Sequence, residues 1–294
     1  MSEQEKSIGV IGFGIMGTSM AKNLAKKGYT VRGYSRTHSK VEASRNCGVI
    51  PSSLEELASC PTILLSVSDG PTVESILFGS EQTSAKGLCT QLSPGTLIID
   101  TTTTAPREAE SFFERCKERG LDFVDCPVTG GDIGAQNGTL TCMCGGAPSA
   151  VKRAEQVLRC IGSKIVHIGE SGSGQRMKAV NQIAVALGIV AMTEALVFSL
   201  NQGIKPEVAL EILQGGAAGS WALSNYAPRI LRGEFGPGFS AEHMLKDLRI
   251  ALSEVQAPLT LAATEAATKK FEALVAQHSG LGNHALIKTF DTEL

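Results

Sequence analysis

The chain has 294 residues, enough for two domains with a substantial buried core. Its 27 basic and 29 acidic side chains leave a formal net charge of −2, which argues against a nucleic-acid or membrane-surface partner held by bulk charge. The N-terminal segment MSEQEKSIGV lacks the basic, apolar and small-residue pattern of a signal peptide. The most apolar run, residues 183–192, is too short to span a membrane and is typical of a buried helix.

The eight cysteines are scattered singly, apart from Cys142 and Cys144. These two alternate on a predicted strand and therefore face the same side. A metal pair is conceivable, but no second His/Cys pair at zinc-site spacing accompanies them. We interpret them as small hydrophobic strand residues and expect no metal. The absence of a paired cysteine framework favours a reducing compartment, so we expect a cytoplasmic protein.

The first half of the chain alternates between apolar β-branched runs and helical patterns. The predicted strands are residues 7–11, 29–34, 62–67, 96–100, 122–126, 140–144 and 165–168. The clearest helices between them are residues 15–27, 106–119 and 149–160. This alternation predicts a largely parallel, doubly wound sheet. Right-handed crossovers would then place the loops after the strands along one ligand-binding edge.

The pattern changes near residue 170, after which only helices are predicted. They cover residues 175–202, 206–213, 220–231, 241–255, 260–277 and 284–290. We therefore expect an α/β Rossmann-type domain over residues 1–170 and a smaller all-α domain over residues 171–294. The long helix is apolar on most faces between residues 183 and 200, so it needs cover from its own domain and, we expect, from another subunit.

A glycine-rich turn, GFGIMG, joins the first predicted strand to the first predicted helix. In this context the pattern is the dinucleotide-binding fingerprint. Gly12 makes the tight turn, Gly14 lets the backbone approach a pyrophosphate, and Gly17 lets the helix pack close to the strand. The helix N-terminus offers free N–H groups to the phosphates. Cofactor contacts are accordingly expected from the whole turn, including Phe13, Ile15 and Met16.

The end of the second predicted strand indicates which dinucleotide binds. An NAD site usually carries an acidic residue there, which grips the ribose hydroxyls. No acidic residue occurs between Lys6 and Val41. Instead the strand ends in Ser35, Arg36 and Thr37, with Lys40 close by. Because an arginine there can pair with a 2′-phosphate, the sequence predicts NADP(H) in preference to NAD(H).

The stretch FVDCPVTGGDIGAQNGTL, residues 123–140, presents a hydroxyl and two glycines after a strand. Thr129 supplies the hydroxyl, and Gly130 and Gly131 expose backbone N–H groups. Together they would form a small nest for a carboxylate. A turn without any ligand would look similar.

The stretch GSGQRMKAVNQ, residues 172–182, places three polar side chains on one face of a predicted helix. Lys178, Asn181 and Gln182 are spaced i, i+3 and i+4. A lysine at the start of an otherwise apolar helix would be partly desolvated, which eases proton exchange near neutral pH. The alternative is an ordinary surface lysine near a helix start.

Four motifs in this order resemble those of the β-hydroxyacid dehydrogenase family, which includes 3-hydroxyisobutyrate dehydrogenase, tartronate semialdehyde reductase and glyoxylate/succinic semialdehyde reductases. The segment IGVIGFGIMGTSMAKNLAKKGYTV resembles the family's dinucleotide signature, and DCPVTGG its D-x-P-V-S-G-G loop. GSGQRMKAVNQ resembles its G-x-G-x-x-x-K-x-x-N-[NQ] helix, and HMLKDLRIAL its C-terminal K-D-L segment. The resemblance covers essentially the whole chain.

The resemblance implies a role for each matching position. Lys178 would be the general acid/base that protonates the carbonyl oxygen during reduction. The backbone and hydroxyl at positions 129–131 would hold the substrate carboxylate. Asn181, with Gln182 beside it, would hold the substrate and orient the lysine. Thr103 and Lys246 match positions that touch the nicotinamide cofactor.

The sequence departs from the family pattern in two places. Thr129 stands where the family usually has serine, so a methyl group is added to the substrate loop. Residues 101–104 are four threonines, where the family more often shows Met-Ser-Thr or Met-Ser-Ser. Trp221, in a segment expected to line the mouth of the site, either closes an apolar wall over the substrate or packs in the core.

These features predict an NADP(H)-dependent oxidoreductase that interconverts a small β-hydroxy acid and its semialdehyde or keto form. A homodimer or homotetramer is expected. One alternative of another class is a catalytically silent dinucleotide sensor, which would not need Lys178, Asn181 and the Thr129 loop. Two enzyme alternatives share the fold: 6-phosphogluconate dehydrogenase, with a further helical domain, and imine reductases, which generally replace the lysine.

Overall fold

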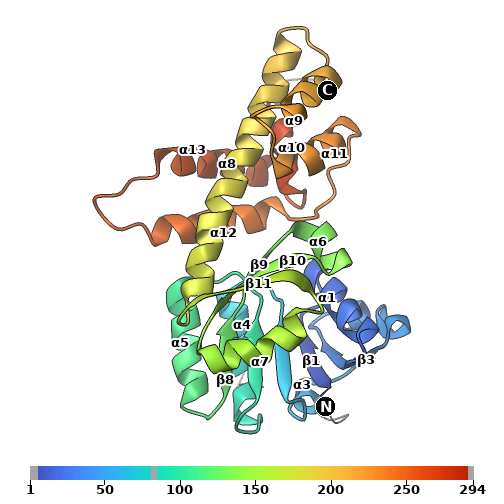
Figure 1. Ribbon diagram of the computed structural model, residues 1–294, viewed down its shortest axis with the longest axis vertical. Coiled ribbons are helices and arrows are strands. Elements are labelled where there is room, and N and C mark those ends of the chain that lie inside the picture. Colours follow the sequence, from blue (N-terminus) through green and yellow to red (C-terminus); the bar gives the residue numbers. More distant parts are fainter. Residues whose placement is uncertain (1–5, 81–84, 291–294) are drawn as a thin grey trace. The chain divides into compact units, whose positions relative to one another are not determined.

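We analysed a computed structural model, which describes residues 6–80 and 85–290. The first five residues, which begin the segment that lacks a signal-peptide pattern, lie outside this range. The chain divides into two compact units, Met1–Lys178 and Ala179–Leu294. The first is α/β and the second is helical, so the expected fold class, a Rossmann-type domain followed by an all-α domain, is confirmed (Figure 1).

A nine-stranded sheet, counted over the described residues, forms the centre of the first unit, with strand order β11-β10-β8-β7-β4-β1-β2-β3 and β9 paired to β10. All neighbours from β8 to β3 along this order are parallel, whereas β10 pairs antiparallel with β8 and β9 and parallel with β11. The bounds are β1 Ser7–Ile11, β2 Thr30–Tyr34, β3 Val49–Pro51, β4 Thr62–Leu65, β7 Leu97–Asp100, β8 Asp122–Asp125, β9 Val128–Thr129, β10 Leu140–Gly145 and β11 Gly162–Gly169.

The register of this sheet aligns the ends of its parallel strands. Tyr34 pairs with Ile11, Ile11 with Leu65, Leu65 with Asp100, and Asp100 with Asp125. Each of these residues is the last of its strand, so the loops that follow five strands all start from one row. This row is the carboxyl edge at which open α/β sheets bind ligands.

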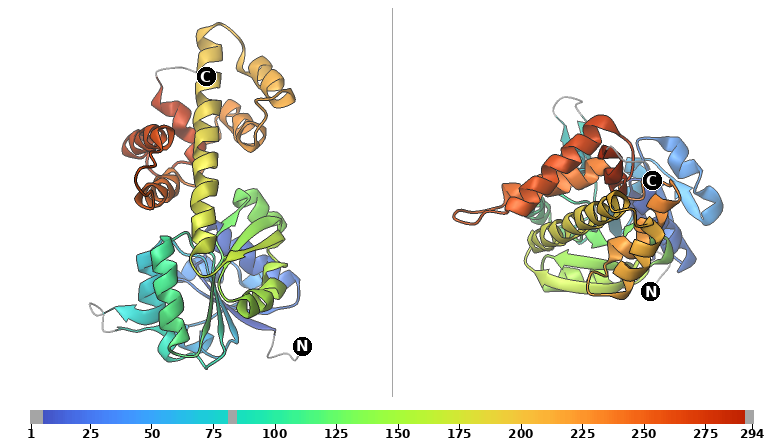
Figure 2. Two further views of the ribbon diagram at one scale, coloured as in Figure 1. Left: turned by 60° about the vertical axis from the view of Figure 1, so that its left-hand side comes forward. Right: turned by 90° about the horizontal axis from the view of Figure 1, so that it is seen from above.

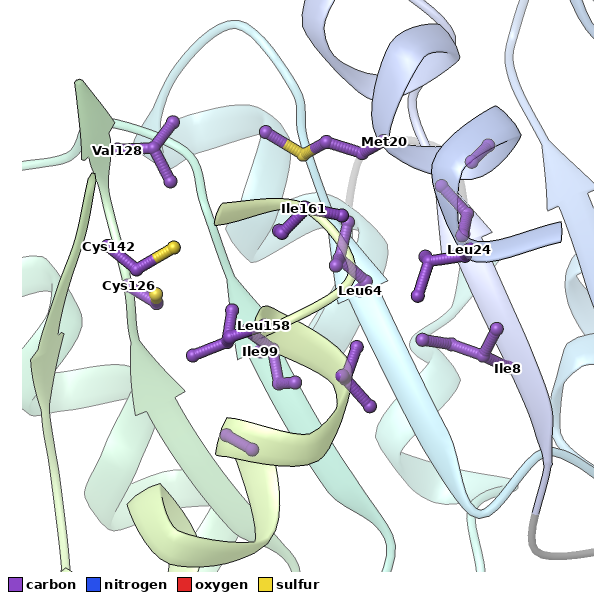
Figure 3. Packing of buried hydrophobic residues seen from close by; sticks show 14 of the residues in the cluster. Ile8, Met20, Leu24, Leu64, Ile99, Cys126, Val128, Cys142, Leu158 and Ile161 are labelled. Carbon is purple, nitrogen blue, oxygen red and sulfur yellow. The ribbon is translucent and has the colours of Figure 1, made fainter. Parts of the chain in front are cut away.

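Successive residues of the central strands face two different cores. Leu64, Ile99 and Val124 belong to one buried cluster, whereas the neighbouring Ile63 and Ile98 belong to another. Helices α1 (Ile15–Lys26) and α7 (Pro148–Leu158) contribute to the first cluster, and α3 (Leu54–Leu57), α4 (Gly70–Phe78) and α5 (Pro106–Lys117) to the second. Both faces of the sheet are therefore covered, as the continuous apolar strands require. Figure 3 shows side chains of the first cluster in contact across the layer.

The cysteines Cys142 and Cys144 are buried in the first cluster, together with Cys126. The Cys126 and Cys144 sulfurs lie 3.6 Å apart. The neighbouring thiols and burial hold the pKa of Cys126 well above its ordinary value, so this thiol stays protonated. The three side chains pack as small hydrophobic groups, and over the described residues no cluster of three or more metal-ligating side chains occurs.

Several short elements of the first unit were not anticipated. These are α2 (His38–Glu42), the short helix α6 (Gly131–Asn137), the three-residue strand β3, the two-residue β9, the β5–β6 hairpin (Gly79–Ser80 and Ala85–Lys86), and the 3₁₀ turns Arg45–Cys47 and Leu88–Thr90. Such segments are too short to show a periodic apolar pattern. The short strands are held by pairing with neighbouring strands, β3 with β2 and β9 with β10.

The second unit surrounds the long helix α8 (Ser173–Asn201) with shorter helices on two sides (Figure 2). These are α9 Pro206–Gly215, α10 Trp221–Asn225, α11 Ala227–Leu231, α12 Ala241–Ser253, α13 Ala262–Gln277 and a 3₁₀ segment Asn283–Thr289. The single helix expected over residues 220–231 is wrong: it is divided at Tyr226. Pro228 explains the break, because it has no N–H to continue the helical ladder and can only occupy the first turn of a new helix.

Helix α8 is the core helix of the second unit. By length and composition the whole helix could cross a membrane, a test that core helices of soluble proteins also pass. Here Ala186, Ile189, Met192 and Leu196 are buried against the surrounding helices. Its buried Gln182 donates a hydrogen bond to Asp247 of α12. These contacts pack one side of the helix inside the second unit, and 33% of its most apolar stretch is buried.

Candidate functional site

The glycine turn between β1 and α1 is closed tightly by backbone packing. Gly12 has φ of 95°, a conformation that favours glycine, and its N–H donates to the Tyr34 carbonyl at 2.9 Å. A Cβ on Gly12 would clash with the carbonyl oxygen of Ser66, and a Cβ on Gly17 with that of Gly12. Both glycines are thus required by the fold itself. Gly14 differs, because a Cβ there would meet nothing within 4 Å.

Within residues 6–80 and 85–290, no side chain caps the first N–H groups of α1. Gly14 is the N-cap and offers no side-chain acceptor, and the first turn contains no acidic residue. Four N–H groups at the start of a helix need partners, and the helix dipole favours an anion there. The open space at Gly14 and the uncapped helix fit a dinucleotide pyrophosphate. The other turn residues divide: Ile15 is exposed and Met16 partly so, whereas the Phe13 side chain is buried in the core and leaves only its backbone to the turn.

The segment after β2 starts from the same edge of the sheet as the glycine turn, because β2 is paired with β1. Ser35 is half-buried, and Arg36, Thr37 and Lys40 are exposed. Among the described residues no ion pair involves Arg36 or Lys40. The nearest acidic residue along the chain, Glu42, instead accepts hydrogen bonds from Arg45 at 2.9 and 3.0 Å. The Arg36 side chain is therefore exposed and makes no ion pair within the described part of the chain.

The four threonines after β7 form a well-anchored loop. The Thr101 hydroxyl donates to the Leu65 carbonyl at 2.6 Å, and the Thr102 hydroxyl accepts from the Val67 N–H at 3.2 Å. Three of the threonines are buried, whereas Thr103 is only half-buried. The loop thus presents Thr103 while its neighbours hold the backbone in place.

The substrate loop predicted after β8 lies beside the lysine predicted to be catalytic. Gly130 and Gly131 have φ of 128° and 66°, values that only glycine adopts readily, and Thr129 is half-buried. The Lys178 ammonium donates to the carbonyl oxygen of Val128 at 2.9 Å. Lys178 is only 5% exposed, so it is not an ordinary surface lysine. The structure therefore brings the ammonium group to the backbone position directly before Thr129.

Asp125 fixes the helix that carries Lys178. Its two carboxylate oxygens accept hydrogen bonds from the N–H groups of Gly172 at 2.8 Å and Gln175 at 3.1 Å. A Cβ on Gly145 or Gly174 would meet this carboxylate at 2.6 or 2.7 Å, so only glycine fits at both positions. Burial raises the pKa of Asp125 above its ordinary value, and the N–H donors counteract that rise.

In the second unit, Asn181 and Gln182 continue the polar face of α8 begun by Lys178. The Asn181 amide donates to Gln182 at 2.8 Å, and Gln182 donates to a carboxylate oxygen of Asp247 at 2.7 Å. Lys246 forms an ion pair with the other oxygen of Asp247 at 3.1 Å. The two predicted residues Gln182 and Lys246 are thus joined through a buried aspartate.

Trp221 begins α10 and is 45% exposed. Its ring meets that of Tyr226 edge-on, with 5.0 Å between the ring centroids. The side chain is therefore supported on one side and open on the other, so it is not packed inside the core.

Sequence reasoning missed three residues that organise this site, Asp125, Gln175 and Asp247. All three are buried polar side chains that bond to predicted site residues or to the loops carrying them. Asp125 and Asp247 stood inside the quoted motifs DCPVTGG and HMLKDLRIAL. A charged residue within an apolar run was the available signal, since it needs a specific partner when buried.

The chain was compared with known proteins. The NAD binding domain of 6-phosphogluconate dehydrogenase matches residues 7–169, and the NAD-binding domain of NADP-dependent 3-hydroxyisobutyrate dehydrogenase matches residues 172–290. An uncharacterised oxidoreductase of Bacillus subtilis, YkwC, is 40% identical over 254 residues, 86% of each chain. The 2-hydroxy-3-oxopropionate reductase of Escherichia coli is 34% identical over 290 residues, 97% of each chain. The solved structure of Mycobacterium tuberculosis 3-hydroxyisobutyrate dehydrogenase with L-serine is 28% identical, with a TM-score of 0.83, and covers 97% of this chain and 99% of that one.

The fold, the glycine turn and these matches define an NAD(P)-dependent oxidoreductase with a Rossmann-type domain. More particularly, the chain belongs to the β-hydroxyacid dehydrogenase family, as its four sequence motifs implied.

The different surroundings of the three glycines can be tested by substitution. Gly14→Ala should leave the midpoint of thermal unfolding nearly unchanged, since space is free and φ is −76°. It should weaken NADPH binding by about tenfold or more, because the methyl group would occupy the approach of the pyrophosphate. Gly17→Ala should instead lower the free energy of unfolding by about 1–3 kcal/mol through overpacking.

Thermal unfolding followed by circular dichroism and titration of NADPH fluorescence measure the two effects. Equal dinucleotide affinity in Gly14→Ala and the unmodified protein would show that the pyrophosphate does not lie against this turn.

Proposed function

We propose that the protein is an NADP(H)-dependent reductase or dehydrogenase of a small β-hydroxy acid and its semialdehyde or keto form. The observation that carries the proposal is the hydrogen bond from Lys178 to the carbonyl of Val128, beside Thr129, Gly130 and Gly131. An amine for proton transfer and a hydroxyl-bearing glycine loop for a carboxylate are thereby adjacent. Both lie at the sheet edge that also carries the glycine turn.

The chemistry divides between the cofactor and the chain. The nicotinamide, when bound, exchanges a hydride with the carbon that bears the substrate oxygen. Lys178 gives a proton to that oxygen during reduction and its positive charge stabilises the developing alkoxide. Thr129 and the backbone N–H groups of Gly130 and Gly131 hold the substrate carboxylate. Asn181 and Gln182, on the same face of α8, orient the substrate and the lysine. Thr103 and Lys246 contact the cofactor. Trp221 lines the mouth of the site.

The alternatives lack comparable support. A silent dinucleotide sensor needs the glycine turn but has no use for a buried lysine at a glycine loop. An imine reductase generally replaces that lysine, and a 6-phosphogluconate dehydrogenase requires a basic cluster for the substrate phosphate, which the sequence does not suggest. Lys178 therefore favours the β-hydroxyacid reaction.

The role of Lys178 predicts a separation of turnover from cofactor binding. Lys178→Ala should lower kcat by about 10²–10⁴-fold, because general acid–base catalysis contributes that much. NADPH affinity should stay within about threefold. The assay follows NADPH consumption with glyoxylate, succinic semialdehyde and tartronate semialdehyde. Lys152→Ala, at an exposed lysine of α7, is the control. Undiminished turnover in Lys178→Ala would remove the proposed mechanism.

The arginine after β2 predicts the cofactor preference. NADPH should bind more tightly than NADH, and Arg36→Ala should weaken NADPH binding by about 10- to 100-fold, the loss of a charged hydrogen bond. NADH binding should change little. Fluorescence titration with both dinucleotides measures this, and Arg45→Ala, which removes an arginine already paired with Glu42, is the control. Equal or tighter NADH binding by the unmodified protein would contradict the preference.

We also infer a soluble, cytoplasmic homo-oligomer, a dimer or tetramer, assembled through the second unit. Large apolar side chains are exposed near the end of α8 and along α9. Phe198 is 65% and Ile212 71% exposed, and Val208, four residues before Ile212, is 50% exposed. Spacing by four places Val208 and Ile212 on one face of α9, and the exposed Ile204 lies just before this helix. An exposed apolar stripe of this kind indicates a protein interface.

This interface can be tested by introducing charge. Sedimentation should show an oligomer of the unmodified protein, and Ile212→Glu should shift it toward the monomer because a charge would be buried between subunits. Leu259→Glu, at an exposed leucine of another segment, should leave the oligomer intact. A monomeric unmodified protein, or an oligomer unaffected by Ile212→Glu, would exclude this assembly.

A further inference from the structure

The Gln175 side chain bridges two backbone groups of the threonine loop. Its amide nitrogen donates to the Thr102 carbonyl at 2.8 Å, and its amide oxygen accepts from the Thr104 N–H at 3.2 Å. These two bonds lie on either side of Thr103. Gln175 is only 1% exposed, so neither bond competes with water. One side chain therefore fixes the backbone both before and after the residue that the loop presents.

The backbone of Gln175 is itself fixed from another strand. Its N–H donates to the Asp125 carboxylate at 3.1 Å, at the end of β8. Gln175 thus connects the loop after β7 to the end of β8 through the first turn of α8. Lys178 follows three residues later on the same helix, a rise of about 4.5 Å. Gln175 is thus one of the residues that fix Thr103 relative to the backbone of Lys178.

The chemistry of the position requires an amide. The Thr102 carbonyl needs a donor and the Thr104 N–H needs an acceptor, and the glutamine side chain supplies one of each in fixed geometry. An apolar side chain of the same length would leave both backbone groups without these bonds. A glutamate would keep the acceptor and set a carboxylate oxygen against the Thr102 carbonyl.

We propose that Gln175 is a positioning residue of the oxidoreductase site. It fixes the position of Thr103 relative to Lys178. The proposal rests on the proposed function, in which Thr103 contacts the nicotinamide cofactor. Gln175 touches neither substrate nor cofactor in this role. It acts by fixing the loop that does.

The test is a double-mutant cycle between Gln175→Met and Thr103→Val. Gln175→Met alone should lower kcat at least tenfold and change KM for NADPH less than threefold, because the pyrophosphate and 2′-phosphate contacts remain. In the Thr103→Val background, the same substitution should lower kcat less than threefold, since no hydroxyl remains to be misplaced. Arg176→Met, an exposed neighbour in the same turn, is the control and should retain full kcat.

Thermal unfolding of each variant is measured alongside the kinetics. Should Gln175→Met fail to fold, the same cycle is run with Gln175→Glu, which keeps the length and the acceptor for the Thr104 N–H. Additive effects of the two substitutions, or an unchanged kcat in the folded Gln175 variant, would overturn the inference. A merely structural role would lower the unfolding temperature without this coupling.

Failure of the proposed function is distinguishable from failure of this inference. The unmodified protein is first titrated with NADPH and NADH and assayed with the three aldehyde acids. Absence of binding or turnover there contradicts the function, and with it the role of Gln175. Binding and turnover by the unmodified protein, with no coupling between Gln175 and Thr103, contradicts the inference alone.

Discussion

The buried Asp125 carboxylate is the interaction on which the arrangement of the site depends. It stands at the end of β8 and accepts the N–H groups of Gly172 and Gln175, which lie at the start of α8. A carboxylate at a helix N-terminus satisfies free N–H groups and opposes the positive end of the helix dipole. Because Lys178 stands on the next turn, the position of its ammonium group follows from where this carboxylate holds the helix. Gly145 and Gly174 leave room for this carboxylate, because a Cβ at either position would clash with it.

Much of the fold follows from the sequence because its signals are periodic. Strands β1, β2, β4, β7 and β8 are short apolar runs bounded by turns, and α8 is a long apolar segment, so their positions were confirmed within a few residues. The division of residues 220–231 at Tyr226 was not anticipated, because the helical pattern of side chains continues through Pro228 although the backbone ladder does not. The short strands β3 and β9 depend on their neighbours and carry no pattern of their own.

The candidate site was predicted less completely, and for a physical reason. Gly12, Gly14, Gly17, Thr129 and Lys178 could be found because local chemistry restricts each of them. Asp125, Gln175 and Asp247, which bond to the start of α8, to the threonine loop and to Gln182, act through partners that are 46 to 73 residues away along the chain. No local spacing reports such contacts. Phe13 lies in the turn in sequence, while its side chain packs in the core.

The segment after β2 and the glycine turn differ in how closely they are packed against the rest of the sheet. Arg36 and Lys40 lie on the surface, and no described contact ties them to the packing of the sheet. Gly12 and Gly17 of the turn, by contrast, have backbone atoms of Ser66 and Gly12 so close that no Cβ fits. Substitutions in the segment after β2 can therefore change the charge of this surface without disturbing the packing of the sheet. The chain is free to vary in composition there while its architecture stays as it is.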